Sequence, residues 1–116
     1  MDEILKQSLL YDFYGELLTE HQKEIYEQFI AEDLSLSEIA NNAGISRQGV
    51  HDLIRRCDKT LEEYETKLHL VEKFLSVKEK VHQINELLEE SQKDGMEESR
   101  LIQKIREIAG EIIEEL

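Results

Sequence analysis

Residues 36–53 constrain the fold more than any other part of this 116-residue chain. They read Leu-Ser-Glu-Ile-Ala-Asn-Asn-Ala-Gly-Ile-Ser-Arg-Gln-Gly-Val-His-Asp-Leu. Two helices that cross steeply need a small residue at their contact, which Ala40 supplies, and a tight turn, which Gly44 permits because glycine adopts a left-handed conformation without a steric clash. Apolar residues occupy the inner positions of both helices: Ile39, Ile45, Val50 and Leu53. Together these constraints predict a helix-turn-helix.

The rest of the chain also favours helices, since it has no proline and only five glycines. Thr19 and Ser35 are each followed three residues later by Gln or Glu, the capping-box spacing that marks a helix start, and Ser46 is a further N-cap. We expect helices over 2–18, 20–31 and 36–43. A long helix starts at residue 47, breaks between Leu68 and Val71 and continues to a turn at 93–95, and a last helix covers 96–116.

This pattern predicts an all-α protein with two parts. Residues 1–70 form the helix-turn-helix domain, and residues 71–116 form an acidic, amphipathic helical hairpin whose apolar face must be buried on the first part or on a partner. The first helix is expected to turn an apolar stripe to the core, made of Ile4, Leu5, Leu9, Leu10, Phe13, Leu17 and Leu18. Cys57 lies on the apolar side of the fourth helix and is expected to be a small core residue.

Composition excludes several functions. No apolar run approaches the roughly 20 residues of a membrane span, and the acidic start of the chain does not resemble a secretory signal. A single cysteine fits a cytoplasmic protein. The four histidines show no metal-ligand spacing with one another or with Cys57, and no phosphate-binding glycine loop or nucleophile elbow is present. We therefore expect no enzyme, no cofactor, no metal and no membrane insertion.

The same residues resemble a known family. Leu18–Gln22, Leu36–Ala40 and Gly44–Val50 are similar to the region-four helix-turn-helix of bacterial sigma factors. The stretch from Leu18 to Leu70, including residues 61–70, more fully resembles the YlxM family of small bacterial proteins, as do the chain length and helical tail. That resemblance implies a DNA-binding protein encoded beside the genes of the signal recognition particle, with a regulatory part in its pathway.

In a helix-turn-helix, the second helix enters the major groove with its N-terminal side chains facing the bases. Here the candidate base readers are Ser46, Arg47, Gln48 and His51, with Asp52 beside them. Arg47 suits a guanine edge and Gln48 an adenine edge, whereas side chains further along the helix suit phosphates. Those candidate phosphate contacts are Arg55, Arg56 and Lys59.

The local charge of the second helix favours DNA binding, whereas the net charge of the chain opposes it. Residues 46–60 hold four basic and two acidic side chains, yet the chain has 27 acidic and 14 basic side chains and a net charge of −13. Because phosphate neutralisation supplies most non-specific DNA affinity, DNA binding by so acidic a chain is expected to need a homodimer. The basic residues could instead be solvated or paired with Asp52, Asp58 or Glu62. The alternative function is a protein-interaction adaptor that docks on a basic ribonucleoprotein such as the signal recognition particle.

Overall fold

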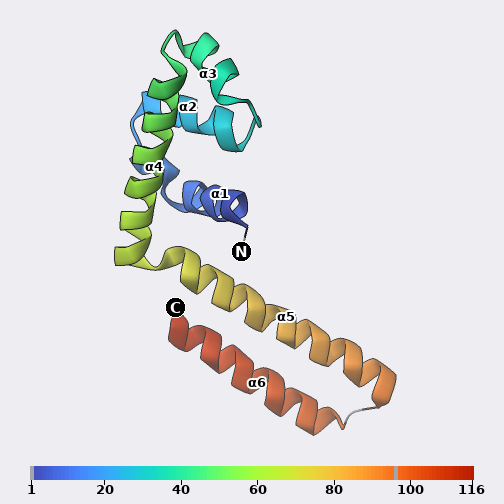
Figure 1. Ribbon diagram of the computed structural model, residues 1–116. Coiled ribbons are helices and arrows are strands. Elements are labelled where there is room, and N and C mark those ends of the chain that lie inside the picture. The colour runs from blue at the N-terminus through green and yellow to red at the C-terminus, as the bar shows by residue number, and fades with distance from the viewer. Residues whose placement is uncertain (1, 96) are drawn as a thin grey trace. The chain divides into compact units, whose positions relative to one another are not determined.

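The computed structural model describes residues 2–95 and 97–116 (Figure 1). Within these ranges the chain is helical and contains no strand, which confirms the all-α prediction. None of the described helices is both long enough and apolar enough to cross a membrane. The elements, in chain order, are α1 (Glu3–Tyr14), the 3-10 turn η1 (Gly15–Leu17), α2 (Glu20–Ile30), α3 (Leu36–Ala43), α4 (Arg47–Leu68), α5 (Leu70–Asp94) and α6 (Glu98–Glu115).

The chain divides into two compact units, Met1–Val71 and Glu72–Leu116. In the first unit α4 is the central element, and α1, α2 and α3 all pack against it. Its apolar face is buried and each such side chain contributes roughly 1.5–3 kcal/mol on leaving water. The fully buried side chains of this unit include Tyr14, Ile25, Tyr26, Ile39, Val50, Cys57 and Leu61. The second unit is an antiparallel hairpin of α5 and α6 (Figure 1).

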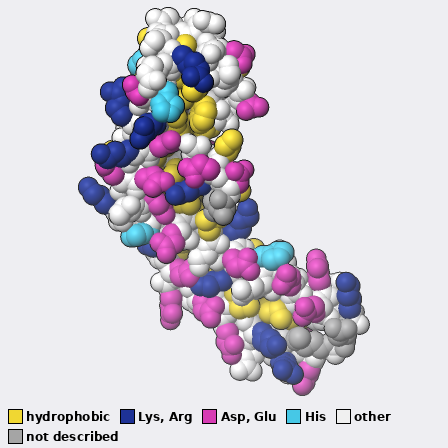
Figure 2. Space-filling model, viewed as in Figure 1, with side chains coloured by type: hydrophobic (Ala, Val, Ile, Leu, Met, Phe, Trp, Pro, Cys, Tyr) yellow, Lys and Arg dark blue, Asp and Glu magenta, His cyan; other side chains and the backbone are white. Residues whose placement is uncertain are grey.

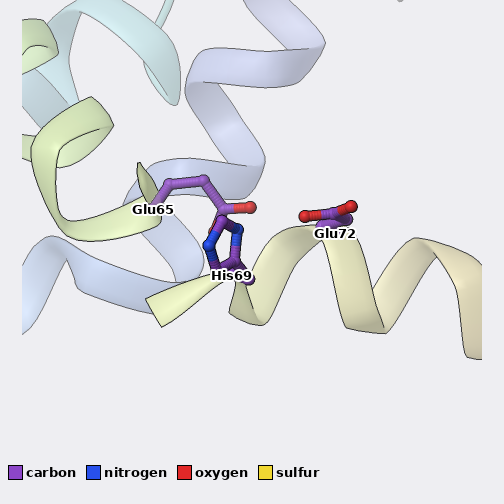
Figure 3. A group of neighbouring side chains, drawn as sticks. All are labelled: Glu65, His69 and Glu72. Atoms are coloured by element: carbon purple, nitrogen blue, oxygen red, sulfur yellow. The ribbon is translucent and has the colours of Figure 1, made fainter. Parts of the chain in front are cut away.

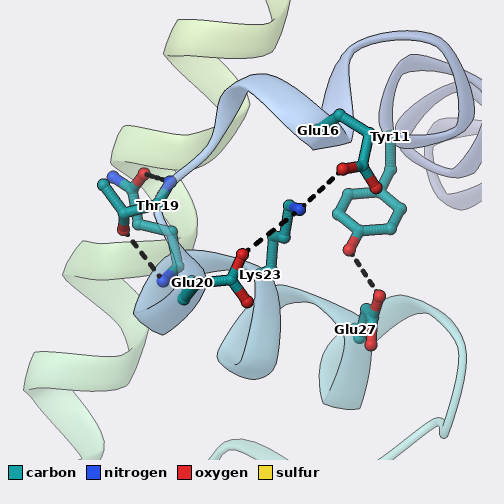
Figure 4. Close-up of polar contacts among 7 residues, drawn as sticks. Tyr11, Glu16, Thr19, Glu20, Lys23 and Glu27 are labelled. Carbon is teal, nitrogen blue, oxygen red and sulfur yellow. Dashed lines mark hydrogen bonds and ion pairs between the residues drawn. The ribbon is translucent and has the colours of Figure 1, made fainter.

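The two predicted capping boxes, at Thr19 and Ser35, are confirmed. The Thr19 hydroxyl accepts the Gln22 amide hydrogen while the Gln22 side chain accepts that of Thr19 (Figure 4). Ser35 and Glu38 form the same reciprocal box at the start of α3. These caps satisfy backbone donors that have no partner inside the helix, which fixes where α2 and α3 begin.

Surface contacts hold α2 beside the end of α1. The Lys23 ammonium lies 2.9 Å from a Glu16 carboxylate oxygen and 3.6 Å from one of Glu20 (Figure 4). The Tyr11 hydroxyl donates to the Glu27 carboxylate at 2.6 Å. Exposed ion pairs of this kind contribute little to stability, so they orient α2 more than they stabilise it.

The prediction for the first helix is wrong in its end and only partly right in its buried face. The α-helix ends at Tyr14, not Leu18, and a 3-10 turn follows. Leu10 and Leu18 of the predicted stripe are buried as expected, but Ile4, Leu5 and Leu17 are more than half exposed and Phe13 is also exposed. The buried face of α1 consists of Gln7, Leu10 and Tyr14.

Hydrogen bonds to α4 explain this change of face. Gln7 donates to both carboxylate oxygens of Asp58, at 2.9 and 3.1 Å, and the buried Tyr26 hydroxyl of α2 donates to the same carboxylate. The Tyr14 hydroxyl donates to Glu65 at 2.6 Å. Buried polar groups need such partners, so Gln7 and Tyr14 turn inward and more apolar side chains turn outward.

The predicted break between Leu68 and Val71 is present, and a residue with a left-handed backbone conformation ends α4. His69 has φ 57° and its amide hydrogen bonds to the Glu65 carbonyl. The amides of Leu70 and Val71, which open α5, donate to the Tyr14 hydroxyl and the Glu65 carboxylate. The predicted turn after α5 is present, with Gly95 at φ 65°. The last helix starts at Glu98, and the predicted start at Met96 lies outside the described residues.

Candidate nucleic-acid interface

The turn between α3 and α4 has the geometry that the sequence predicts. Gly44 follows α3 with φ 70° and ψ 28°, and its amide bonds to the Ala40 carbonyl at 2.9 Å. The Ser46 hydroxyl then accepts the Gly49 amide hydrogen at 2.9 Å and caps α4. The turn therefore presents the first residues of α4 at the surface while Ile39 and Val50 are fully buried beneath it.

All seven predicted contact residues are exposed: Ser46, Arg47, Gln48, His51, Arg55, Arg56 and Lys59. Each residue advances the direction of the side chain by about 100° around a helix, so the six that follow Ser46 share one half of the circumference of α4. The opposite half carries Val50, Ile54 and Cys57, which are buried. The first half of α4 thus has one apolar, buried side and one polar, exposed side.

The cations on this side have no ion-pair partner among the described residues. Asp58 is bound by Tyr26 and Gln7, and Glu62 lies 2.8 Å from Lys6 of α1. Arg55 and Arg56 therefore do not form ion pairs with Asp58 or Glu62, as the alternative prediction had them. Both arginines instead line an open, shallow pocket of about 550 Å³ with Asp52 and Lys59.

The charge distribution is visible at the surface. Lys and Arg side chains gather along the side of the first unit where α4 runs, whereas Asp and Glu side chains are spread over both units (Figure 2). We name the exposed side of α4 formed by residues 46–59 the basic face. It concentrates positive charge within an acidic chain, which is the distribution that phosphate binding requires.

Gln48 and Asp52 interact on the basic face. The Gln48 side-chain amide donates to an Asp52 carboxylate oxygen at 3.0 Å, and His51 Nδ1 lies 3.8 Å from the same oxygen. The spacing of four residues on a helix accounts for this contact. Asp52 therefore fixes the direction of Gln48, and its carboxylate could accept a hydrogen bond from a cytosine amino group.

Gly49 is the third residue of α4, and its amide donates to the Ser46 cap. A Cβ atom at this position would lie 3.1 Å from the Ser46 hydroxyl oxygen and 3.9 Å from Ile45. A contact of 3.1 Å is tighter than about nine in ten real Cβ contacts, so a larger residue here would require the Ser46 side chain to shift by a few tenths of an ångström.

A second polar cluster lies where α4 ends and α5 begins. Figure 3 shows Glu65, His69 and Glu72 as neighbouring side chains. One carboxylate oxygen of Glu65 accepts hydrogen bonds from the Tyr14 hydroxyl and the Val71 amide. Glu65 therefore has a structural role at this junction.

Comparison with known proteins gives a family match over most of the chain. The family model described as "UPF0122: Putative helix-turn-helix protein, YlxM / p13 like" matches residues 1–108. A UPF0122 protein of Thermoanaerobacter sp. (strain X514) is 41% identical over 116 residues, which cover 97% of this chain and 96% of the relative. A UPF0122 protein of Caldanaerobacter subterraneus subsp. tengcongensis is 47% identical over 87 residues, or 75% of this chain and 74% of the relative.

Proposed function

This chain belongs to the UPF0122 family of YlxM/p13-like helix-turn-helix proteins, and we propose that it is a cytoplasmic regulatory protein that binds double-stranded DNA through the basic face of α4. The observation that carries the proposal is the set of exposed cations, Arg47, Arg55, Arg56 and Lys59, with no ion-pair partner among the described residues. Cations paired with protein carboxylates would have to lose those partners before binding phosphate, whereas these do not.

The side chains divide into two roles. At the start of α4, Arg47 and Gln48 suit bidentate hydrogen bonds to a guanine and an adenine edge, and Ser46 and His51 lie beside them. Arg55, Arg56 and Lys59 lie one to three turns further along and suit phosphate contacts, which position a protein without reading sequence. A homodimer would engage two half-sites and supply the affinity that one acidic module lacks.

Mobility-shift titrations at several salt concentrations test the proposal, starting from DNA selected from a random pool. Arg47→Ala should lose roughly 1–3 kcal/mol on the selected site and relax the preference at one base pair. Lys59→Ala should weaken binding to every sequence alike and reduce the salt-dependence slope by about one unit. Lys67→Ala removes an exposed cation of the same helix outside the basic face and is the matched control.

The result decides between two surfaces. Equal losses for the Lys67 control and the Lys59 variant would place DNA binding elsewhere on the molecule. Absence of binding by the wild type at low salt would remove DNA as the ligand.

A second function is favoured by the net charge of −13. As an adaptor, the protein would dock on a basic ribonucleoprotein, and the genomic context of the resembling YlxM family makes the signal recognition particle the candidate. Opposite net charge steers such an encounter. Affinity capture from bacterial lysate with and without a DNA-specific nuclease separates the two functions, because a partner held by DNA is lost on that treatment and a directly bound ribonucleoprotein is retained.

A further inference from the structure

The hairpin of the second unit leaves apolar side chains at its surface. None of the described side chains of residues 72–116 is buried. The residues between the two helices are only partly covered, among them Ile84 and Leu87 on α5 and Ile105 and Ile108 on α6. Two helices alone bury too little apolar surface for a stable unit of this size, so a further surface must contribute.

Each helix carries a second apolar stripe outside the contact between α5 and α6. On α5, Val81 and Leu88 are 45% and 42% exposed, and Phe74 precedes them at the same spacing of seven residues. On α6, the stripe comprises Ile102, Ala109, Ile113 and Leu116, of which Ile113 is 74% exposed. A spacing of seven returns to nearly the same side of a helix, with a drift of about 20°.

The two stripes lie on the same side of the hairpin. Each residue advances the side-chain direction by about 100° around the helix axis. On both helices, the stripe is rotated by roughly a quarter turn from the side that faces the other helix, in the direction of increasing residue number. Because the two helices run antiparallel, these two rotations bring both stripes to the same side of the hairpin (Figure 1). We name this side, formed by Val81, Leu88, Ile102 and Ile113, the apolar face of the hairpin.

Several acidic side chains lie on the opposite side of the hairpin. Glu86 and Glu90 of α5 line one pocket there together with Glu107 and Lys104 of α6. The border of the apolar face carries exposed charges of both signs, Lys78 and Glu89 on α5 and Arg106 on α6. A copy of this hairpin can therefore approach the apolar face without bringing the main acidic surfaces together.

We propose that the apolar face binds the apolar face of a second copy of this chain, so that two hairpins form an antiparallel four-helix bundle. Stripes with a seven-residue repeat on two adjacent helices suit helices that cross at about 20°, as in such bundles. The face is self-complementary, because it is apolar at the centre and mixed in charge at the border. This inference deepens the homodimer of the proposed function by naming its interface, and it rests on the hairpin and not on DNA binding by α4.

The test uses the full chain and a matched pair of double variants. Val81→Glu/Ile113→Glu places two carboxylates on the apolar face. Gln83→Glu/Gln103→Glu adds the same charge at exposed positions outside it. Light scattering after size exclusion should give the mass of two chains for the wild type and the Gln variant and of one chain for the Val81/Ile113 variant, with helical circular dichroism as the check on folding.

A second measurement covers the case in which the Val81/Ile113 variant unfolds. The melting temperature of a wild-type dimer rises with protein concentration, whereas that of a monomer does not. A wild type with the mass of one chain and a concentration-independent melting temperature overturns the proposal. So does a dimer that survives in the folded Val81/Ile113 variant. The variant Arg55→Ala/Lys59→Ala should keep the mass of two chains, which separates this proposal from DNA binding.

Discussion

Asp58 lies on α4 at the point where three elements meet. Its carboxylate accepts hydrogen bonds from Gln7 of α1 and from the buried Tyr26 hydroxyl of α2. Burial raises the pKa of this carboxyl above its ordinary value, although the two hydrogen bonds act in the opposite direction. Asp58 thus orients α4 within the first unit and provides the hydrogen-bond acceptor for the Tyr26 hydroxyl and the Gln7 amide.

Removal of the Asp58 carboxylate should be more damaging than neutralisation. Asp58→Ala leaves Tyr26 and Gln7 without an acceptor, and we expect the free energy of unfolding to fall by about 1–3 kcal/mol. Asp58→Asn keeps an acceptor for Tyr26, and the Gln7 amide can rotate to accept from the new amide, so its loss should be smaller. Urea unfolding at pH 7 measures both variants, and equal losses would contradict this role of the hydrogen bonds.

The raised pKa of Asp58 also predicts a pH dependence of stability. The folded protein keeps this proton at a pH where the unfolded chain has lost it, so the stability contributed by this group is full below the ordinary pKa of about 4 and is lost as the pH rises through the raised value. Relative to Asp58→Asn, the wild type should therefore be most stable at the acid end of a series from pH 4 to 7. A constant difference across the series would contradict the shift.

Cys57 is fully buried beneath the basic face, and burial raises the pKa of its thiol to about 11. Because the thiolate is the reactive species, native protein should react with a disulfide reagent far more slowly than protein in denaturant. The chain has one cysteine, so the absorbance change reports this residue alone. Equal rates in buffer and in denaturant would show that Cys57 is accessible.

At the scale of the element, local signals predicted more than distant ones. The boxes at Thr19 and Ser35 and the left-handed Gly44 follow from residues within four positions of each other, and the sequence showed them. The buried face of α1 depends instead on residues such as Tyr14, whose hydroxyl partner Glu65 is 51 residues away. A periodic pattern of apolar residues cannot reveal that Gln7 and Tyr14 have distant partners, so the predicted face of α1 was only partly right.

Gly44 offers a test of the turn between α3 and α4. A Cβ atom there would meet no atom within 4 Å, so a substitution acts through backbone strain at φ 70° alone. We expect Gly44→Val to lower the free energy of unfolding by a kcal/mol or more.

Gly110, inside α6, also has open space around it. Gly110→Ala should raise the free energy of unfolding by roughly 0.5–1 kcal/mol, because alanine favours a helix. Thermal or urea unfolding should show the two opposite signs.

For the whole molecule, the net charge of −13 is expected to oppose the proposed DNA binding through acidic residues that do not contact DNA. Glu86, Glu90 and Glu107 belong to the hairpin unit, whereas the basic face belongs to the first unit. Changing all three to Gln should strengthen DNA binding at about 10 mM salt, where the screening length is roughly 30 Å, and have little effect at about 150 mM, where it is roughly 8 Å. Mobility shifts at the two salt concentrations measure this, and an equal gain at both would indicate direct contact with DNA.

The candidate site was predictable only in part. The sequence placed Ser46, Arg47 and Gln48 at the start of a helix because the cap and the turn are local signals. It left open whether Arg55 and Arg56 pair with acids, since Asp58 is within reach along the helix. The structure assigns Asp58 to Tyr26 and Gln7, and those partners lie on α2 and α1, beyond the reach of any spacing rule.

The cap at the start of α5 bears on the order in which the chain folds during synthesis. The amides of Leu70 and Val71 donate to Tyr14 and Glu65, and both acceptor residues emerge from the ribosome before α5 does. Once α1 and α4 have packed, the acceptors for the first turn of α5 are already in place. Helix formation is limited by its first turn, so α5 can start at residue 70 and grow as further residues emerge. The N-terminal unit thus holds, before α5 is made, the acceptors for the first backbone donors of that helix.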